Sequence, residues 1–152
     1  HVAYAERDAF DHALAQAIDA HRPDLIVMAG FMRIVGAEFI RHYRGRMLNI
    51  HPSLLPKYPG LKTHQRALEA GDAEHGATVH FVTEELDGGP AIIQGRFSVR
   101  PEDTVESLAA RVMDEIEVKI YPQAIAWLAR DEMSFDRLGR MRGMDDLQEE
   151  FR

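Results

Sequence analysis

Apolar residues recur with a helical period near the start of the chain. Five of them fall at positions i, i+3, i+4, i+7 and i+8, namely Phe10, Ala13, Leu14, Ala17 and Ile18. This spacing predicts one apolar face of an amphipathic helix. We expect Asp8 to cap the start of that helix and Pro23 to end it.

A continuous apolar run, LIVMAG, follows over residues 25–30. Branched residues in such a run favour a central parallel strand whose two faces are both covered. A short helix is then predicted over residues 37–43 and a second strand over residues 47–50. A strand, a short helix and a strand over this distance indicate a right-handed crossover unit.

The rest of the chain alternates between segments with the helical period and segments typical of strands. A helix is predicted over residues 64–71, ended by Gly71, and strands over residues 77–82 and 91–99. A last helix is expected to begin at Asp103, its N-cap, with Glu106 three residues later, and Pro122 is expected to kink or break it. The pattern predicts an α/β fold with an open, mostly parallel, twisted sheet flanked by helices. Residues 1–130 would form one domain, and residues 131–152 a charged, peripheral C-terminal tail.

Composition narrows the function classes. The chain has 152 residues, a formal net charge of −7 and no cysteine. The acidic balance makes nucleic acid a poor partner, and no apolar run approaches the roughly 20 residues that a membrane span needs. The lack of cysteine excludes disulfides, thiolate nucleophiles and cysteine-bound metal, and it is consistent with a cytoplasmic location.

The stretch NIHPSLLPKYPG places an amide and an imidazole at the end of a predicted strand. Asn49 and His51 are two residues apart, so their side chains point to the same face. Pro52 cannot donate to a ladder and should end the strand, which puts both groups where ligands bind in open α/β sheets. An amide and a protonated imidazole could stabilise an oxyanion; alternatively, backbone groups satisfy both at a strand end. The histidine spacing does not indicate a metal site, and we expect none.

A second candidate lies in the acidic segment TEELDGGP, residues 83–90, which is longer than a two-residue hairpin turn. Asp87 is followed by two glycines, which permit close approach of a ligand but are also typical of a plain turn. His80 alternates with Val79 and Phe81, so it faces away from them. We favour a supporting role for His80 at the site over that of a core histidine.

Four motifs, AGFMRI, NIHPSLLPKYPG, HGATVHFVTEELDGGP and IYP, resemble the folate-dependent formyltransferases, and most closely the glycinamide ribonucleotide formyltransferases of purine biosynthesis. The resemblance covers residues 7–128. It implies formyl transfer from 10-formyltetrahydrofolate, a co-substrate, to the amine of glycinamide ribonucleotide through a tetrahedral intermediate, without a metal. It also implies a catalytic trio of Asn49, His51 and Asp87. Asn49 and a cationic His51 would stabilise the oxyanion, and Asp87 would keep His51 charged and help to remove the amine proton.

The resemblance implies further binding residues. Arg7 would lie near the substrate phosphate, and Asn49 and Glu117 would also contact the substrate. The folate pocket would be lined by Met32, Arg33, Ile34 and Val35. Without the resemblance, Arg7 would be a surface charge and the segment 32–35 a packed connector. The family pattern has a histidine after the glutamate, whereas Val118 follows Glu117 here, so a solvated helix face is an equal alternative for Glu117.

A larger departure concerns the front of the chain. The family opens with a strand and a glycine- and serine-rich loop that holds the substrate phosphate, and no such loop occurs before Leu25. We therefore expect an N-terminal part to be missing and the chain alone to be poorly active. Two alternatives stay open: a formyltetrahydrofolate deformylase, and a non-catalytic truncated remnant. The expected partners are small-molecule substrates, and the oligomeric state is open, with a homodimer as one candidate.

Overall fold

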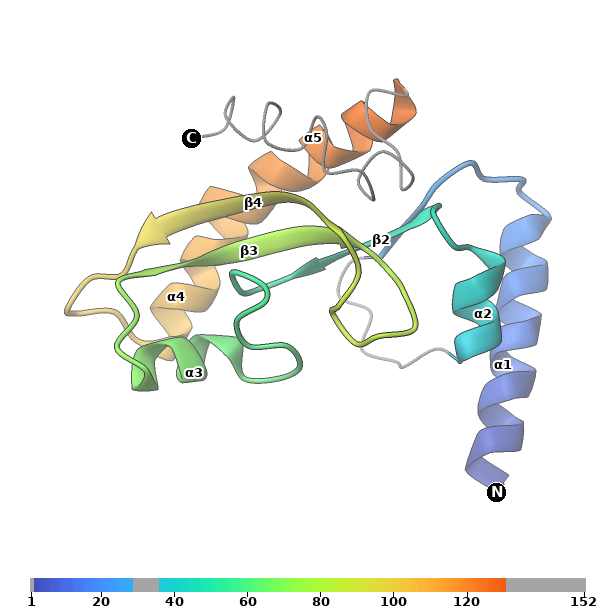
Figure 1. Cartoon of the computed structure of the whole chain (residues 1–152), viewed down its shortest axis with the longest axis horizontal. Helices are drawn as coiled ribbons and strands as arrows, with labels where there is room; N and C mark the ends of the chain where they lie inside the picture. Colours follow the sequence, from blue (N-terminus) through green and yellow to red (C-terminus); the bar gives the residue numbers. More distant parts are fainter. Residues whose placement is uncertain (1, 29–35, 131–152) are drawn as a thin grey trace.

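The computed structural model describes residues 2–28 and 36–130, except the side chains of residues 2–5 and 7. In chain order, the elements are α1 (Val2–Asp19), β1 (Ile26–Met28), α2 (Ala37–His42), β2 (Met47–His51), α3 (Thr63–Glu69), β3 (Glu74–Phe81), β4 (Ala91–Ser98), α4 (Val105–Arg111), the π-helical segment η1 (Val112–Glu117) and α5 (Val118–Ala129). Figure 1 shows α1 and α2 at one end of the sheet. The expected tail over residues 131–152 lies outside the described residues.

The four described strands form an open sheet in the order β1-β2-β3-β4. Strands β1 and β2 are parallel, whereas β2–β3 and β3–β4 are antiparallel. The expected α/β fold with an open, helix-flanked sheet is confirmed, but the described sheet is mixed rather than mostly parallel. A parallel pair needs a crossover of a dozen or more residues, and the segment 82–90 between β3 and β4 is too short for one.

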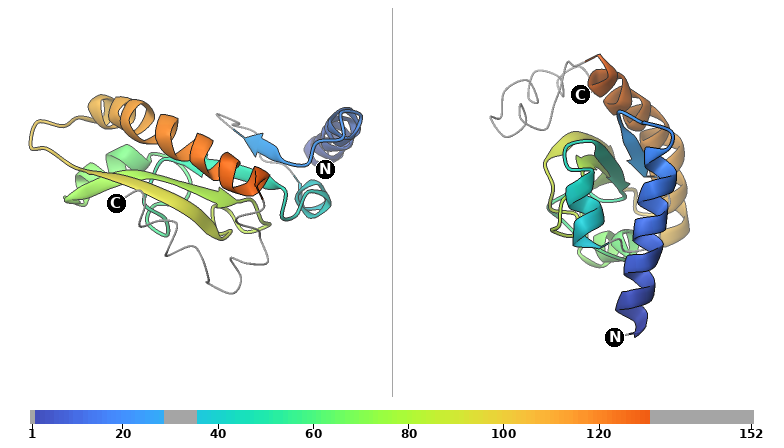
Figure 2. Two further views of the ribbon diagram at one scale, coloured as in Figure 1. Left: turned by 90° about the horizontal axis from the view of Figure 1, so that it is seen from above. Right: turned by 90° about the vertical axis from the view of Figure 1, so that its right-hand side faces the viewer.

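One face of the sheet is apolar and packs against the helical layer formed by η1 and α5 (Figure 2). The fully buried side chains from the strands include Leu48, Val79 and Phe81, and the helical layer contributes Ile120 and Trp127. Burial of large apolar side chains is worth roughly 1.5–3 kcal/mol each. This packing holds the strands in register.

Helices α1 and α2 cover the other face near β1. Phe39, Tyr43 and Met47 form a second buried cluster there, and the Tyr43 hydroxyl donates to the carbonyl of Ala15 at 3.1 Å. The predicted cap at Asp8 is wrong, because α1 already begins at Val2. Asp11, within α1, instead contacts the start of α2, where its Oδ2 accepts the Gly36 N–H at 2.6 Å.

The prediction that the first strand is covered on both faces is also wrong for the described residues. Strand β1 forms the edge of the described sheet, and Val27 is 40% exposed. Residues 29 and 30 of the apolar run lie outside the described residues. Both central and edge strands can be apolar. The composition of the run therefore does not decide whether the strand lies at the centre or at the edge of the sheet.

The last helix differs from expectation at two points. Thr104, not Asp103, is the N-cap, and its capping box is closed by Ser107 rather than Glu106. Pro122 lies inside α5 without ending it. The irregularity precedes the proline instead, as the π-helical turn of η1. This turn interrupts the regular hydrogen-bond pattern of the helix shortly before Pro122, which has no N–H to donate.

Candidate active site

A strip of polar side chains crosses the middle of the sheet on the face opposite the helical layer. Strand β2 ends at His51, immediately before Pro52, as predicted. Asn49 pairs with His80 of β3, and His51 pairs with Thr78. Directly opposed residues of an antiparallel pair share a face, so these four side chains lie together.

His51 is buried between two acceptors. Its Nε2 lies 2.7 Å from the Tyr58 carbonyl oxygen, and its Nδ1 lies 3.4 Å from Oδ2 of Asp87. Neither oxygen can donate, so only a ring protonated at both nitrogens satisfies both contacts. The geometry therefore favours an imidazolium paired with a carboxylate.

The segment 52–62 is fixed over this strip by side chains that no sequence motif predicted as functional. The fully buried Thr78 Oγ1 donates to the Ser53 carbonyl at 2.8 Å and accepts the Leu55 N–H at 3.1 Å. Gln94 of β4 donates to the Leu55 carbonyl at 2.6 Å. The sequence carried one signal for Thr78, because it shares the strand face of His80 within an otherwise apolar run.

Asp87 reaches His51 from the far loop, residues 82–90. Its side chain is 9% exposed, and its Oδ2 also accepts the Gly60 N–H at 2.9 Å, which joins the two loops. Its φ angle is +52°, a left-handed conformation that costs an ordinary residue about 1–2 kcal/mol. Such strain persists where the surroundings enforce it, often at functional sites.

His80 is the third member of this cluster. Its ring is 3% exposed, its Nδ1 lies 3.0 Å from the Phe81 carbonyl oxygen, and its Nε2 lies 3.7 Å from Oδ1 of Asp87. Burial lowers the pKa of His80, and the charge of His51 lowers it further, against the opposing effects of the Phe81 carbonyl and Asp87. The ring is therefore neutral near pH 7.

The other predicted site residues are placed differently. Met32, Arg33, Ile34 and Val35 lie outside the described residues, as does the side chain of Arg7, whose backbone belongs to α1. Glu117 is the last residue of η1, in the helical layer on the other side of the sheet. Burial raises the pKa of its carboxyl group.

Tyr121, from the IYP motif, connects the helical layer to the strands. Its hydroxyl donates to the carbonyl oxygens of Met28 and Leu48. Burial raises the pKa of Tyr121, and the charge of Glu117 one turn earlier adds to the effect. Tyr121 thus ties α5 to the last residue of β1 and to the second residue of β2, which explains the motif as structural support.

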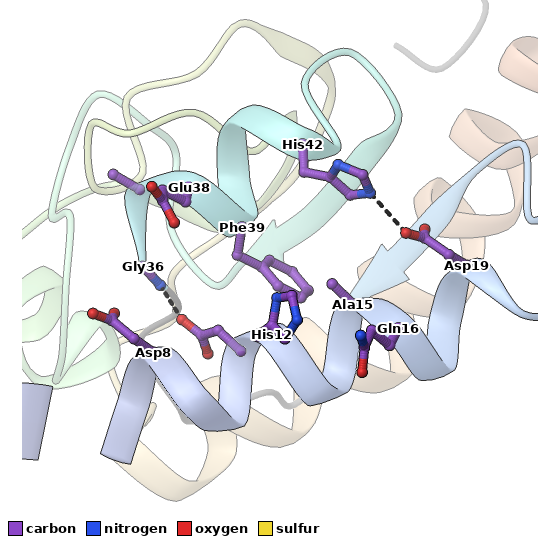
Figure 3. Close-up of a pocket in the computed structure, with 11 residues that line it drawn as sticks. Asp8, His12, Ala15, Gln16, Asp19, Gly36, Glu38, Phe39 and His42 are labelled. Atoms are coloured by element: carbon purple, nitrogen blue, oxygen red, sulfur yellow. Dashed lines mark hydrogen bonds and ion pairs between the residues drawn. The ribbon is translucent and has the colours of Figure 1, made fainter. Parts of the chain in front are cut away.

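A separate pocket of about 530 Å³ lies between α1 and α2 (Figure 3). Four of its eleven lining residues are acidic, and Asn49, His51 and Asp87 do not belong to it. Within it, His42 Nε2 lies 2.8 Å from Oδ2 of Asp19, and this hydrogen bond is the main cause that lowers the pKa of Asp19. Contacts of this kind hold α1 and α2 together, so helix packing accounts for the polar side chains of this pocket.

The described residues were also compared with what a metal site and a membrane-spanning helix require. In the ranges 2–28 and 36–130, no three histidine or carboxylate side chains converge in a way that could hold a metal ion. None of the helices in those ranges combines the length and the apolar character that crossing a bilayer requires.

Comparison with known proteins agrees with the motifs. The family model described as formyl transferase matches residues 1–125. The phosphoribosylglycinamide formyltransferase of Escherichia coli (strain K12) is 55% identical over 127 residues, which cover 84% of this chain and 59% of that protein. That of Haemophilus influenzae is 47% identical over 137 residues, which cover 90% and 60%.

A solved structure extends this similarity to the fold. The phosphoribosylglycinamide formyltransferase of Coxiella burnetii, in complex with CHES, matches with a TM-score of 0.80 and 53% identity, covering 84% of this chain and 60% of that one. The chain thus spans about three fifths of the length of the relatives that it matches.

Proposed function

The chain belongs to the formyl transferase family, and on this premise we propose that it carries the reaction centre for formyl transfer from 10-formyltetrahydrofolate to the amine of glycinamide ribonucleotide, in de novo purine biosynthesis. The observation that carries the proposal is the buried contact between His51 and Asp87, with Asn49 on the same strand face. The names of the relatives support the choice of acceptor.

The chemistry matches the side chains. When the amine attacks the formyl carbon, a C–N bond forms and the carbonyl oxygen becomes an oxyanion. The Asn49 amide can donate to it, and the cationic His51 ring supplies positive charge beside it. For direct donation, the Nε2–H that points at the Tyr58 carbonyl would be shared with the oxyanion. Asp87 takes the amine proton, which finally goes to the departing folate nitrogen as its C–N bond breaks.

The remaining assignments follow from the same premise. Arg7 and Asn49 would bind the ribonucleotide. Glu117 would contact it from the helical layer, near the end of β1 that the hydroxyl of Tyr121 reaches. The folate would be held by Met32, Arg33, Ile34 and Val35. We propose a catalytic domain over residues 1–130, small-molecule partners, a cytoplasmic location and no metal requirement; a homodimer is one assembly to test by sedimentation.

The test compares turnover among matched variants in the complete enzyme, because the chain alone is expected to be poorly active. His51→Ala and Asp87→Ala should each lower kcat at least about 10²-fold, because each removes a group that acts on the reacting atoms. His42→Ala, at an exposed histidine paired with Asp19 outside the site, should leave kcat near that of the unsubstituted chain. Formyl consumption should require the ribonucleotide amine.

Three results would contradict the proposal. Near-normal turnover in either site variant would remove the mechanism. Formyl release without the amine would indicate a deformylase. Failure of the complete enzyme both to bind a non-reactive folate analogue and to consume the formyl donor would indicate a non-catalytic protein.

A further inference from the structure

His80 has a fixed tautomer that the reaction described above does not use. The Phe81 carbonyl oxygen, 3.0 Å from Nδ1, can only accept a hydrogen bond, so Nδ1 carries the ring proton. The ring is nearly fully buried, and burial favours its neutral form. In that form, Nε2 has a lone pair and no proton.

The surroundings of Nε2 leave that lone pair without a donor. Nε2 is buried and has no hydrogen-bond partner, and it faces Oδ1 of Asp87 at 3.7 Å. While Asp87 is ionised, two acceptors face each other. A buried acceptor without a donor is unfavourable, so this arrangement calls for a proton between the two atoms.

The two oxygens of Asp87 have different surroundings. Oδ2 accepts the Gly60 N–H at 2.9 Å and lies 3.4 Å from Nδ1 of His51. Oδ1 faces His80 instead. The carboxylate is thus oriented by the two donors on Oδ2, while Oδ1 is the oxygen at which an added proton would meet a waiting acceptor.

We propose that His80 is a positioning residue for the general base: its Nε2 accepts a hydrogen bond from Oδ1 of Asp87 once Asp87 has taken the proton of the attacking amine. The inference deepens the proposed function and rests on it. The amine N–H bond breaks, an O–H bond forms at Oδ1, and the electron pair stays on the nitrogen. The proton is held between Oδ1 and Nε2 until the departing folate nitrogen takes it.

The groups around His80 fit this role. His51 and Asp87 are the titratable groups that face it, and Asn49 lies opposite it on β2. The positive His51 disfavours a second positive ring next to it, so His80 keeps its lone pair while Asp87 is ionised. His80 therefore stays unprotonated at Nε2 before the reaction. It can then accept a hydrogen bond from Oδ1 once Asp87 is protonated.

The first arm of the test is kinetic. His80→Leu removes the acceptor and should lower kcat about tenfold, the effect of one lost hydrogen bond, with KM nearly unchanged. His80→Gln, whose amide oxygen can accept, should recover part of the loss. His75→Leu is the matched control, because His75 is another buried histidine, bonded to His64 rather than to Asp87. Full kcat in His80→Leu, or a change in KM alone, would overturn the inference.

The second arm reads the ring directly and does not depend on turnover or on the folding of a His80 variant. Nitrogen-15 NMR of the unsubstituted chain at pH 7 should show the neutral Nδ1–H tautomer of His80 with an unprotonated Nε2. In Asp87→Asn, whose neutral side chain offers an N–H donor in place of the protonated acid, the Nε2 resonance should move in the direction of a hydrogen-bonded acceptor. An Nε2–H tautomer, or an imidazolium, would overturn the inference. Absence of formyl transfer in the complete, unsubstituted enzyme would instead contradict the proposed function, so the two failures are distinguishable.

Discussion

Two residues with positive φ angles contact the His51 ring from opposite sides. Tyr58, at +55°, supplies the carbonyl that accepts from Nε2, and Asp87, at +52°, supplies the carboxylate near Nδ1. Each conformation is unfavourable for a residue with a side chain. The contacts that enforce them belong to the two loops, which the Gly60–Asp87 hydrogen bond joins.

Gly89 determines how closely the Asp87 loop can return to β3. A Cβ at Gly89 would lie 1.8 Å from the Phe81 carbonyl oxygen, which is rigid backbone. We expect Gly89→Ala to displace the loop and to lower the free energy of unfolding by about 1–3 kcal/mol, as measured by urea denaturation.

Gly88→Ala is the matched control for this prediction. Its Cβ would meet the Glu85 side chain, which is exposed and can move away. Its effect should therefore be clearly smaller. Equal losses in the two variants would show that general loop stiffness, rather than the approach to Phe81, sets the requirement for glycine.

At the scale of single elements, the sequence located most helices and strands but misplaced their ends. The segment before α4 offers two overlapping capping boxes, one from Asp103 to Glu106 and one from Thr104 to Ser107. Oδ2 of Asp103 instead forms an ion pair with Nη1 of Arg111 at 2.7 Å and accepts the Arg100 N–H, also at 2.7 Å. Those tertiary contacts leave Thr104 to cap the helix, which local spacing could not decide.

The cap at α4 gives a prediction at this scale. Thr104→Ala should lower the free energy of unfolding by about 1 kcal/mol, because the Ser107 N–H loses its acceptor. Glu106→Ala, which removes the residue that the sequence assigned to the box, should change it by less than about 0.5 kcal/mol. Thermal melts of both variants decide the matter, and a larger loss in Glu106→Ala would contradict the described cap.

At the scale of the whole molecule, a pair of histidines, with His75 buried and His64 half-buried, joins α3 to β3. His64 Nδ1 lies 2.9 Å from His75 Nε2. Burial, and then the charge of His64, lowers the pKa of His75 to about 4, against the opposing charge of Asp72. Burial also lowers the pKa of His64, as does the charge of His51. Both rings are thus held neutral in the folded protein.

This pair predicts how stability depends on pH. An unfolded histidine titrates near pH 6.5, so between about pH 4 and 6.5 the unfolded chain binds more protons than the folded one. The free energy of unfolding should therefore fall as the pH drops through this window, by up to about 3 kcal/mol for His75. Urea denaturation across the window measures the slope.

Variants assign the slope to the pair. His75→Gln should flatten the pH dependence between about pH 4 and 6.5 because the titrating group is gone. His42→Gln, at an exposed histidine, should keep the slope of the unsubstituted chain. An identical slope in His75→Gln would show that other groups cause the acid sensitivity.

The sequence by itself determined the alternation of helices and strands, the shared strand face of Asn49 and His51, and the motifs that identify the family. These features depend on residues close together in the chain, or on short quoted stretches, so periodicity and resemblance suffice for them. The catalytic role of Asp87 followed only from the resemblance, because the spacing of a loop does not say which strand end it approaches.

Only the tertiary structure decided which groups meet. It brought Asp87 to His51 and His80, placed Thr78 and Gln94 under the segment 52–62, and made the described sheet mixed with β1 at its edge. These outcomes depend on contacts between segments far apart in the chain. Their free energies come from packing and from pairing buried polar groups, which no local pattern encodes.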